Sequence, residues 1–140
     1  MSKAEIIELK QGKKVMATGR RKEAVARVQL MLSGKGLFLV NGKKWDQYFT
    51  TPFLKNLVSE PLQKANLQDS VDVKARVNGG GITGQAGAIR LGISRAIVEN
   101  NPDLKSPFKK EKFLTRDPRS KERKKYGQKG ARRKFQWTKR

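Results

Sequence analysis

Cationic side chains offer the main chemistry of this 140-residue sequence, and they gather toward its C-terminus. Residues 105–140 hold sixteen Lys or Arg and three acidic residues, a net charge of +13 out of +21 for the whole chain. Lys and Arg bind phosphates, and aromatic rings offer faces on which nucleic-acid bases stack. Four aromatic residues, Phe113, Tyr126, Phe135 and Trp137, are spread among the charges that follow Phe108. The composition therefore favours a nucleic-acid-binding arm over a merely solvated tail.

A glycine-rich run is the second feature that could bind phosphate. Gly79, Gly81 and Gly84 fit the G-x-G-x-x-G pattern between a predicted strand and a predicted helix, and Glu99 or Asp103 follows near the distance of a ribose-binding acid. The pattern is short, however, and the preceding strand alternates between apolar and polar residues, unlike a central Rossmann strand. A dinucleotide site is therefore disfavoured. Backbone N–H groups at a helix N-terminus can instead hold an RNA phosphate, although a tight strand-to-helix turn without a ligand explains the glycines equally well.

Catalytic and metal-binding chemistry find little support in the composition. The chain contains no Cys and no His, which removes disulfides, thiolate metal sites and the commonest general base. The acidic residues are scattered, so we expect no enzyme activity, no cofactor and no metal. No apolar run approaches the roughly 20 residues that cross a bilayer, and the N-terminal sequence lacks the apolar core of a signal peptide. The sequence therefore predicts a soluble, intracellular protein that does not associate with membranes.

Alternating apolar residues predict strands in the first part of the chain. The expected strands are residues 15–18, 24–32, 37–40 and 71–78. The second and third should form a hairpin, because Gly34 and Gly36 favour a turn between them. Residues 19–22 are expected to form another turn, which carries three adjacent cations.

Apolar residues at helical spacing predict two helices. The first lies in residues 45–65, with Pro52 in its first turn and Pro61 ending or restarting it; its aromatic residues are expected to lie in the core. The second runs from about residue 83 to 100, and its Arg90 and Arg95 can point outward. Small residues recur at every fourth position of this helix and permit close approach to a sheet: Gly84, Ala88, Gly92 and Ala96.

The predicted elements divide the chain into three regions. Residues 1–13 form a flexible extension, residues 14–104 a globular α/β domain of the two-layer α+β kind, and residues 105–140 a basic tail. The tail holds too few aliphatic residues to build a core, and its like charges repel one another. We therefore expect it to be extended unless a polyanion neutralises it.

Four motifs resemble one known family. They are ATGRRKEAVARV at 17–28, VNGGGITGQAGAIRLGISRA at 77–96, FLTRDPRSKERKKYG at 113–127 and the terminal TKR. They are similar to small-subunit ribosomal protein number nine, in the form found in bacteria and organelles. The resemblance implies a fold like domain two of ribosomal protein five: a sheet with helices on one face and a left-handed βαβ crossover. It also implies a C-terminal extension that threads through rRNA in the subunit head and reaches the peptidyl-site tRNA.

The resemblance also implies roles for individual residues. The cations of residues 19–22 match an RNA-contacting turn, the glycines of residues 79–81 match a glycine loop, and Lys139 and Arg140 match the tip that approaches tRNA. The rRNA-binding residues that it implies are Arg20, Arg21, Lys22, Gly79, Gly80, Gly81, Arg116, Arg119, Arg123, Lys124, Lys125 and Tyr126. Further cations that we expect to bind rRNA are Arg27, Lys129, Arg132, Arg133 and Lys134. The sequence departs from the family where Phe135 replaces a common Pro and Gly130 a common Lys.

The sequence thus predicts a structural RNA-binding protein of the small ribosomal subunit. Its expected partners are rRNA, peptidyl-site tRNA and neighbouring head proteins, on a bacterial cytoplasmic or an organellar ribosome, without homo-oligomers. A DNA-compacting protein is one alternative, which co-sedimentation with ribosomal particles would exclude. A nucleotide-dependent enzyme is another, which nucleotide binding without RNA would support. A polybasic membrane-surface protein is the third, but no amphipathic or lipidated anchor is evident.

Overall fold

The computed structural model describes residues 14–139, and within them five strands form one mixed sheet. β1 (Lys14–Arg21) and β2 (Ala24–Met31) form an antiparallel hairpin, and β5 (Asp72–Asn78) pairs antiparallel with the other edge of β2. β3 (Phe38–Val40) runs parallel to β5, and β4 (Lys43–Lys44) pairs antiparallel with β3. The strand order is β1-β2-β5-β3-β4.

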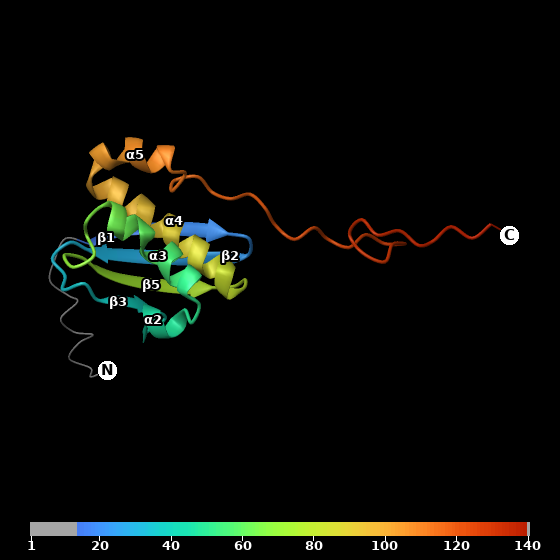
Figure 1. Ribbon diagram of the computed structural model, residues 1–140, viewed down its shortest axis with the longest axis horizontal. Helices are drawn as coiled ribbons and strands as arrows, with labels where there is room; N and C mark the ends of the chain where they lie inside the picture. Colours follow the sequence, from blue (N-terminus) through green and yellow to red (C-terminus); the bar gives the residue numbers. More distant parts are fainter. Residues whose placement is uncertain (1–13, 140) are drawn as a thin grey trace.

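Two long helices cover one face of the sheet and leave the other face open (Figure 1). The helical elements are α2 (Trp45–Tyr48), α3 (Pro52–Lys64), α4 (Ile82–Asn100), the 3-10 turn η2 (Pro102–Leu104) and α5 (Lys105–Lys110). α4 packs on β1 and β2, and α3 packs beside α4. α2 and α3 connect the parallel strands β3 and β5, so these elements form a βαβ unit. The predicted two-layer α+β fold is confirmed.

The helix and the sheet touch most closely where glycines face each other. A Cβ atom on Gly19 of β1 would lie 1.9 Å from the carbonyl oxygen of Ala88 and 2.5 Å from the backbone nitrogen of Gly92. A Cβ atom on Gly92 would lie 2.6 Å from a methyl carbon of Val28. Side chains do not tolerate such distances. The predicted close approach along the small residues of α4 is therefore confirmed.

The core lies between the helices and the sheet. Along β5, Val73, Ala75 and Val77 are buried while the intervening residues are not. Ile89 and Ile93 of α4 are fully buried against the same layer. The period of two in the strand and the helical spacing in α4 were both visible in the sequence, so these two elements match their predictions closely.

The pairing of the first strands differs from the prediction in two ways. β1 continues through Arg21, which pairs with Ala24, so residues 19–21 belong to the strand and the chain reverses at Lys22 and Glu23. The predicted hairpin between residues 24–32 and 37–40 is wrong, because β5 lies between β2 and β3. The intervening loop is held to β5, whose Asp72 accepts hydrogen bonds from the backbone N–H groups of Lys35 and Leu37 at 2.8 Å.

The helix predicted within residues 45–65 is α3, the short helix α2 precedes it, and Pro61 does not end α3. α3 begins at Pro52, as predicted, and continues past Pro61 to Lys64. Proline removes one backbone hydrogen bond from a helix interior, but Pro61 is fully buried, so its packing offsets that loss. The aromatic residues divide: Phe49 is in the core, whereas Phe53 is 68% exposed.

The start of the basic segment packs on the domain. Phe108 of α5 and Phe113 are buried, with ring centroids 5.2 Å apart in an edge-to-face contact. Phe113 is therefore a core residue and does not offer the stacking face that we predicted. Beyond Asp117 the chain leaves the domain past α5 and runs away from it, with one small loop on the way (Figure 1). The predicted extension of residues 1–13 and Arg140 lie outside the described residues.

Candidate nucleic-acid interface

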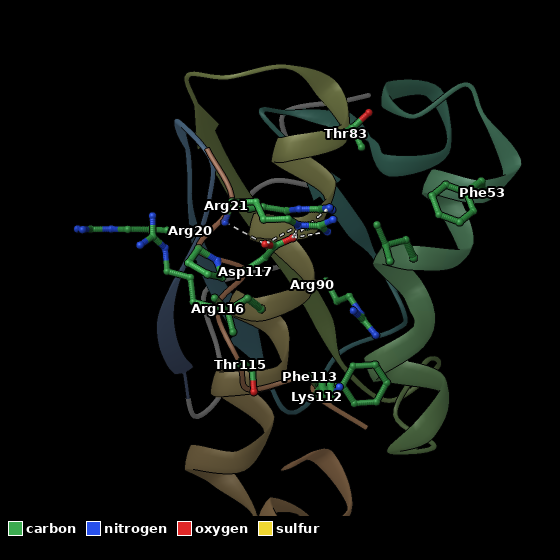
Figure 2. Close-up of a pocket in the computed structure, with 15 residues that line it drawn as sticks. Arg20, Arg21, Phe53, Thr83, Arg90, Lys112, Phe113, Thr115, Arg116 and Asp117 are labelled. Atoms are coloured by element: carbon green, nitrogen blue, oxygen red, sulfur yellow. Dashed lines mark hydrogen bonds and ion pairs between the residues drawn. The ribbon is translucent and has the colours of Figure 1, made fainter. Parts of the chain in front are cut away.

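Two adjacent cations of β1 point to opposite faces of the sheet. Figure 2 shows Arg20 pointing away from the helices while Arg21 lies against α4. The stem of Arg21 occupies the space above Gly87, where a Cβ atom would lie 2.3 Å from the Arg21 Cδ. The Arg21 guanidinium is 3.5 Å from the carboxylate of Asp117. rRNA binding by both arginines remains a prediction, but only Arg20 is exposed, whereas Arg21 already has a partner within the chain.

A cavity of about 430 Å³ lies where the tail crosses α3 and α4 (Figure 2). Arg90 lines it and does not point outward as predicted. Its guanidinium forms an ion pair of 3.0 Å with Glu60 and lies 4.5 Å from the ring centroid of Phe113. A cation over an aromatic face is attracted by the ring quadrupole. Arg90 therefore fixes the first part of the tail to both helices.

Asp117 holds the point where the tail leaves the domain. The carboxylate of Asp117 accepts three hydrogen bonds from Arg119: from Nε at 3.0 Å, from Nη2 at 2.8 Å and from the backbone nitrogen at 3.1 Å. These hydrogen bonds, and to a smaller extent the charges of Arg119 and Arg21, hold the pKa of Asp117 well below its usual range. The carboxylate therefore stays ionised at neutral pH, and its contacts are lost only when the pH falls into the acid range.

A second acidic residue, Glu122, holds together the small loop of the tail, residues 122–132. Glu122 forms ion pairs with Lys125 and with Arg132, the latter at 2.9 Å. The hydrogen bond from Lys125, followed by that from Arg132, lowers the pKa of Glu122. Lys125 also donates a hydrogen bond of 3.2 Å to the carbonyl oxygen of Ala131. These contacts bring both ends of the loop together, so the tail is not a uniformly extended strand.

Most of the predicted rRNA-binding side chains of the tail are accessible. Those exposed are Arg116, Arg119, Arg123, Lys124, Lys129, Arg132, Arg133 and Lys134, while Lys125 is half-buried. Lys139, which was predicted to approach tRNA, is exposed as well. Tyr126 is 95% exposed and Trp137 82% exposed, and Lys129 lies 5.3 Å from the ring centroid of the exposed Phe135. The tail thus presents cations and aromatic faces together, which suits both the phosphates and the bases of a nucleic acid.

The glycine loop is shaped largely by the fold. Gly79 and Gly80 have φ angles of +71° and +63°, which disfavour other residues. A Cβ atom on Gly80 would lie 3.0 Å from the backbone nitrogen of Ala24, so the loop packs against the β1–β2 turn. Gln85 donates a hydrogen bond of 3.1 Å to the carbonyl oxygen of Gly79 and holds the loop. Gly81, which precedes α4, has open space around it, so phosphate binding by the loop, which remains a prediction, has room only there.

The arrangement around the loop does not suit a dinucleotide. A dinucleotide fold places its acidic ribose ligand after a second parallel strand. Here Glu99 lies within α4, and β5 is flanked by the antiparallel strand β2 and the parallel strand β3.

Two substitutions separate the structural role of the loop from a ligand role. Gly80→Val is expected to lower the free energy of unfolding by about 2 kcal/mol, because a β-branched residue is strained in the left-handed region. Gly81→Asn should leave stability nearly unchanged, since Asn is a favoured N-cap residue and the site is open. Urea denaturation and RNA affinity at fixed salt are the measurements. If Gly81→Asn binds RNA as tightly as the parent chain, no phosphate approaches this loop closely.

Two cations that were not predicted as binding residues lie beside Arg27. Lys74 and Arg76 of β5 lie on the open face of the sheet, and Arg76 is directly opposite Arg27 in the register of β2 and β5. Their alternation with buried residues marked them as polar-face residues. What the sequence did not indicate is that β5 pairs with β2, which gathers these cations into one cluster.

Residues 14–139 contain neither a membrane-spanning helix nor a cluster of metal ligands. None of the helices within residues 14–139 combines the length and apolar character needed to cross a membrane. In the same residues, no group of three or more His, Cys, Asp or Glu side chains is arranged to hold a metal ion.

Comparisons with known proteins agree on one family. The model of the family described as ribosomal protein S9/S16 matches residues 19–140. The small ribosomal subunit protein uS9 of Maridesulfovibrio salexigens is 52% identical over 124 residues, which cover 89% of this chain and 95% of that relative. The proteins of the same name from Anaeromyxobacter sp. (strain K) and Anaeromyxobacter dehalogenans are 51% identical over 125 residues, with the same coverage.

Proposed function

The chain belongs to the ribosomal protein S9/S16 family, whose members are structural proteins and not enzymes, and we propose how it works in the small ribosomal subunit. Its domain binds folded rRNA in the subunit head, and its tail neutralises phosphates between rRNA helices. The end of the tail approaches the peptidyl-site tRNA. The bacterial origin of the relatives indicates a ribosome in the cytoplasm of a bacterium or in an organelle.

One observation carries this proposal: a fixed domain from which a cationic, aromatic-bearing segment runs outward (Figure 1). The 22 residues from Pro118 to Lys139 could span up to about 75 Å if fully extended. A segment of that length can pass between rRNA helices and still reach a second RNA molecule. Because the segment buries almost no apolar surface of its own, its order on the ribosome depends on the polyanion around it.

Sedimentation tests the assignment to the ribosome. The full-length chain, expressed with a small affinity tag in a bacterium whose own copy has been replaced, should sediment with small subunits in a sucrose gradient. It should remain there when DNA is digested. A chain found mainly with DNA, or in the light fractions, would support a nucleic-acid-compacting protein in its place.

Removal of Lys139 and Arg140 tests the proposed tip. The described core draws on residues up to Leu114, so the loss of Lys139 and Arg140 should leave folding and subunit assembly unchanged. We expect the binding free energy of tRNA at the peptidyl site to become weaker by roughly 1–2 kcal/mol, the scale of one or two charge-assisted hydrogen bonds. Arg140 is suited to this role because a guanidinium can hold a phosphate through two parallel hydrogen bonds. The measurement compares purified subunits of both kinds at fixed salt and magnesium.

A charge-matched variant controls for the loss of two positive charges. Lys109 and Lys110 are exposed on α5, far back along the chain, and their double replacement by glutamine should not affect tRNA affinity. Equal tRNA affinity of the truncated and parent subunits, with both fully assembled, would show that the tip does not hold tRNA. That result would not contradict the proposed rRNA binding by the rest of the chain.

A further inference from the structure

Four cations gather on the face of the sheet that α3 and α4 leave open. Arg27 of β2 lies directly opposite Arg76 of β5 in the antiparallel register. Lys74 lies two residues before Arg76 on the same face, and Arg20 comes from β1. Together they line a hollow of about 730 Å³. These four residues are called the open-face cations below.

The register of the strands brings like charges together, so this cluster destabilises the fold when no counter-charge is bound. Like charges directly opposite each other on neighbouring strands destabilise an antiparallel pair, and Arg27 and Arg76 stand in that relation. Within residues 14–139, none of the open-face cations forms an ion pair. The acidic residue of β5 on this face is Asp72, whose Oδ1 already accepts two backbone hydrogen bonds. The cluster therefore has no internal counter-charge in the described part of the chain.

The rest of the hollow is neutral and partly fixed by hydrogen bonds. Asn41 accepts a hydrogen bond from the backbone N–H of Val77 at 2.8 Å and donates one to its carbonyl oxygen at 3.0 Å. Val25 and Asn78 are paired across the strands beside the cations. Among the described residues that line the hollow, none is aromatic, so no ring is present on which a base could stack. Recognition here must involve charge rather than bases.

We infer that the open-face cations bind the sugar–phosphate backbone of an RNA helix, as a contact separate from the tail; this rests on the proposed function. Adjacent strands lie about 4.8 Å apart, so Arg27 and Arg76 can hold one phosphate between them. Paired guanidinium donors match phosphate oxygens, and the bound negative charge offsets the repulsion between the two arginines. The lack of aromatic rings favours a helical backbone over single-stranded bases, which are held by stacking.

The same features argue against a protein partner for this face. The centres of protein–protein interfaces are poor in charged residues and rich in aromatic ones, whereas this hollow is centred on cations. Met31 and Leu39 of the open face are buried with Leu37 packed against them. Met16 of β1 is 62% exposed on this face, and a single side chain offers little apolar surface for a partner to cover.

The double variant Arg27→Gln/Arg76→Gln in the full-length chain tests the inference. The probes are a 16-base-pair RNA duplex and a poly(U) of similar length, titrated at several salt concentrations. Duplex affinity should fall at least about tenfold, and the log–log salt slope should flatten by about 1.5, because each lost phosphate contact contributes roughly 0.7–0.9. Poly(U) binding should change much less, since the tail carries the exposed aromatic residues. The charge-matched control, Lys109→Gln/Lys110→Gln, should retain the duplex affinity.

The Tm of the glutamine variant distinguishes an RNA contact from a purely structural role. If the two arginines served only to stabilise the fold, their replacement would lower Tm. Because the two arginines repel each other, the glutamine variant should keep or raise Tm while it loses duplex affinity. Arg27→Lys/Arg76→Lys keeps both charges and should keep the salt slope; a flattened slope in this variant would overturn the phosphate contact.

The outcomes separate this inference from the proposed function. Equal duplex affinity of the glutamine variant and its control overturns the open-face contact, while sedimentation with small subunits would still support the proposed function. If the glutamine variant keeps its duplex affinity but small subunits that contain it lack a neighbouring protein, the face docks protein and the inference is also overturned. A parent chain that binds neither probe and does not sediment with small subunits contradicts the proposed function itself.

Discussion

Replacement of Gly19 by alanine is expected to lower the free energy of unfolding by about 3 kcal/mol or more, at or above the upper end of the usual range for overpacked cores. The new Cβ atom would lie 1.9 Å from one backbone atom of α4 and 2.5 Å from another. Backbone atoms cannot rotate away as a side chain can, so the whole helix must move off β1. Since single domains are stable by only about 5–15 kcal/mol, Tm should fall by more than about 10 °C.

Thermal and urea denaturation followed by circular dichroism are the measurements. Gly130→Ala is the matched control, because it adds the same methyl group where the nearest atom, the Cβ of Arg133, would be 3.6 Å away. That distance is an ordinary van der Waals contact, so the control should keep the parent Tm. A Gly19→Ala chain with the parent Tm would mean that β1 and α4 are not in direct backbone contact.

Deletion of residues 116–140 is expected to abolish most of the salt dependence of RNA binding. The deletion removes twelve cationic and two acidic side chains. If half of these cations contact phosphates, the log–log slope of affinity against salt should flatten by about 4–5, since each contact contributes roughly 0.7–0.9. Affinity for an rRNA fragment of the subunit head should then fall by orders of magnitude at low salt.

Deletion of residues 1–13 is a suitable control for this experiment. That segment holds three lysines and two glutamates, a net charge of only +1, so its loss should barely alter the slope. The truncated chain ending at residue 115 keeps Phe108 and Phe113 in the core, and its unfolding transition should remain cooperative. An unchanged slope in that chain would show that the tail does not bind phosphates.

The sequence predicted best those elements whose pattern is local. β5 alternates strictly between buried and polar residues, and α4 carries its small residues at helical spacing, so both were found close to their true bounds. Strand pairing is not a local property, and the hairpin expected between residues 24–32 and 37–40 does not exist because β5 intervenes. α5 was missed because it is short and lysine-rich; burial of Phe108 holds it on the domain.

The candidate site shows the same difference between features set by local sequence and features set by strand pairing. The exposed cations and aromatic rings of the tail could be predicted from composition, because charge density decides their exposure. The different environments of Arg20 and Arg21 could not, since a turn was expected where β1 in fact continues and sends alternate side chains to opposite faces. Arg76 lies among the polar residues of the alternating strand predicted at residues 71–78, but only the pairing of β5 with β2 shows that it opposes Arg27.

The anchored start of the tail has a consequence for how two RNA contacts combine. Residues 105–117 are held by Phe108, by Phe113 beneath Arg90, and by Asp117 between Arg21 and Arg119. Only the residues beyond Asp117 therefore act as the tether between the domain and the distal cations. A shorter tether confines its end to a smaller volume, and short tethers reach effective concentrations in the millimolar range.

Under the proposed function, domain and tail thus behave as the two arms of a bivalent ligand. Once one arm is bound to rRNA, the other meets its target at a local concentration far above that of the free protein, and the overall avidity exceeds that of either arm. Loosening the anchor at Asp117 would lengthen the tether and dilute the distal arm, although none of the residues that contact RNA would have changed.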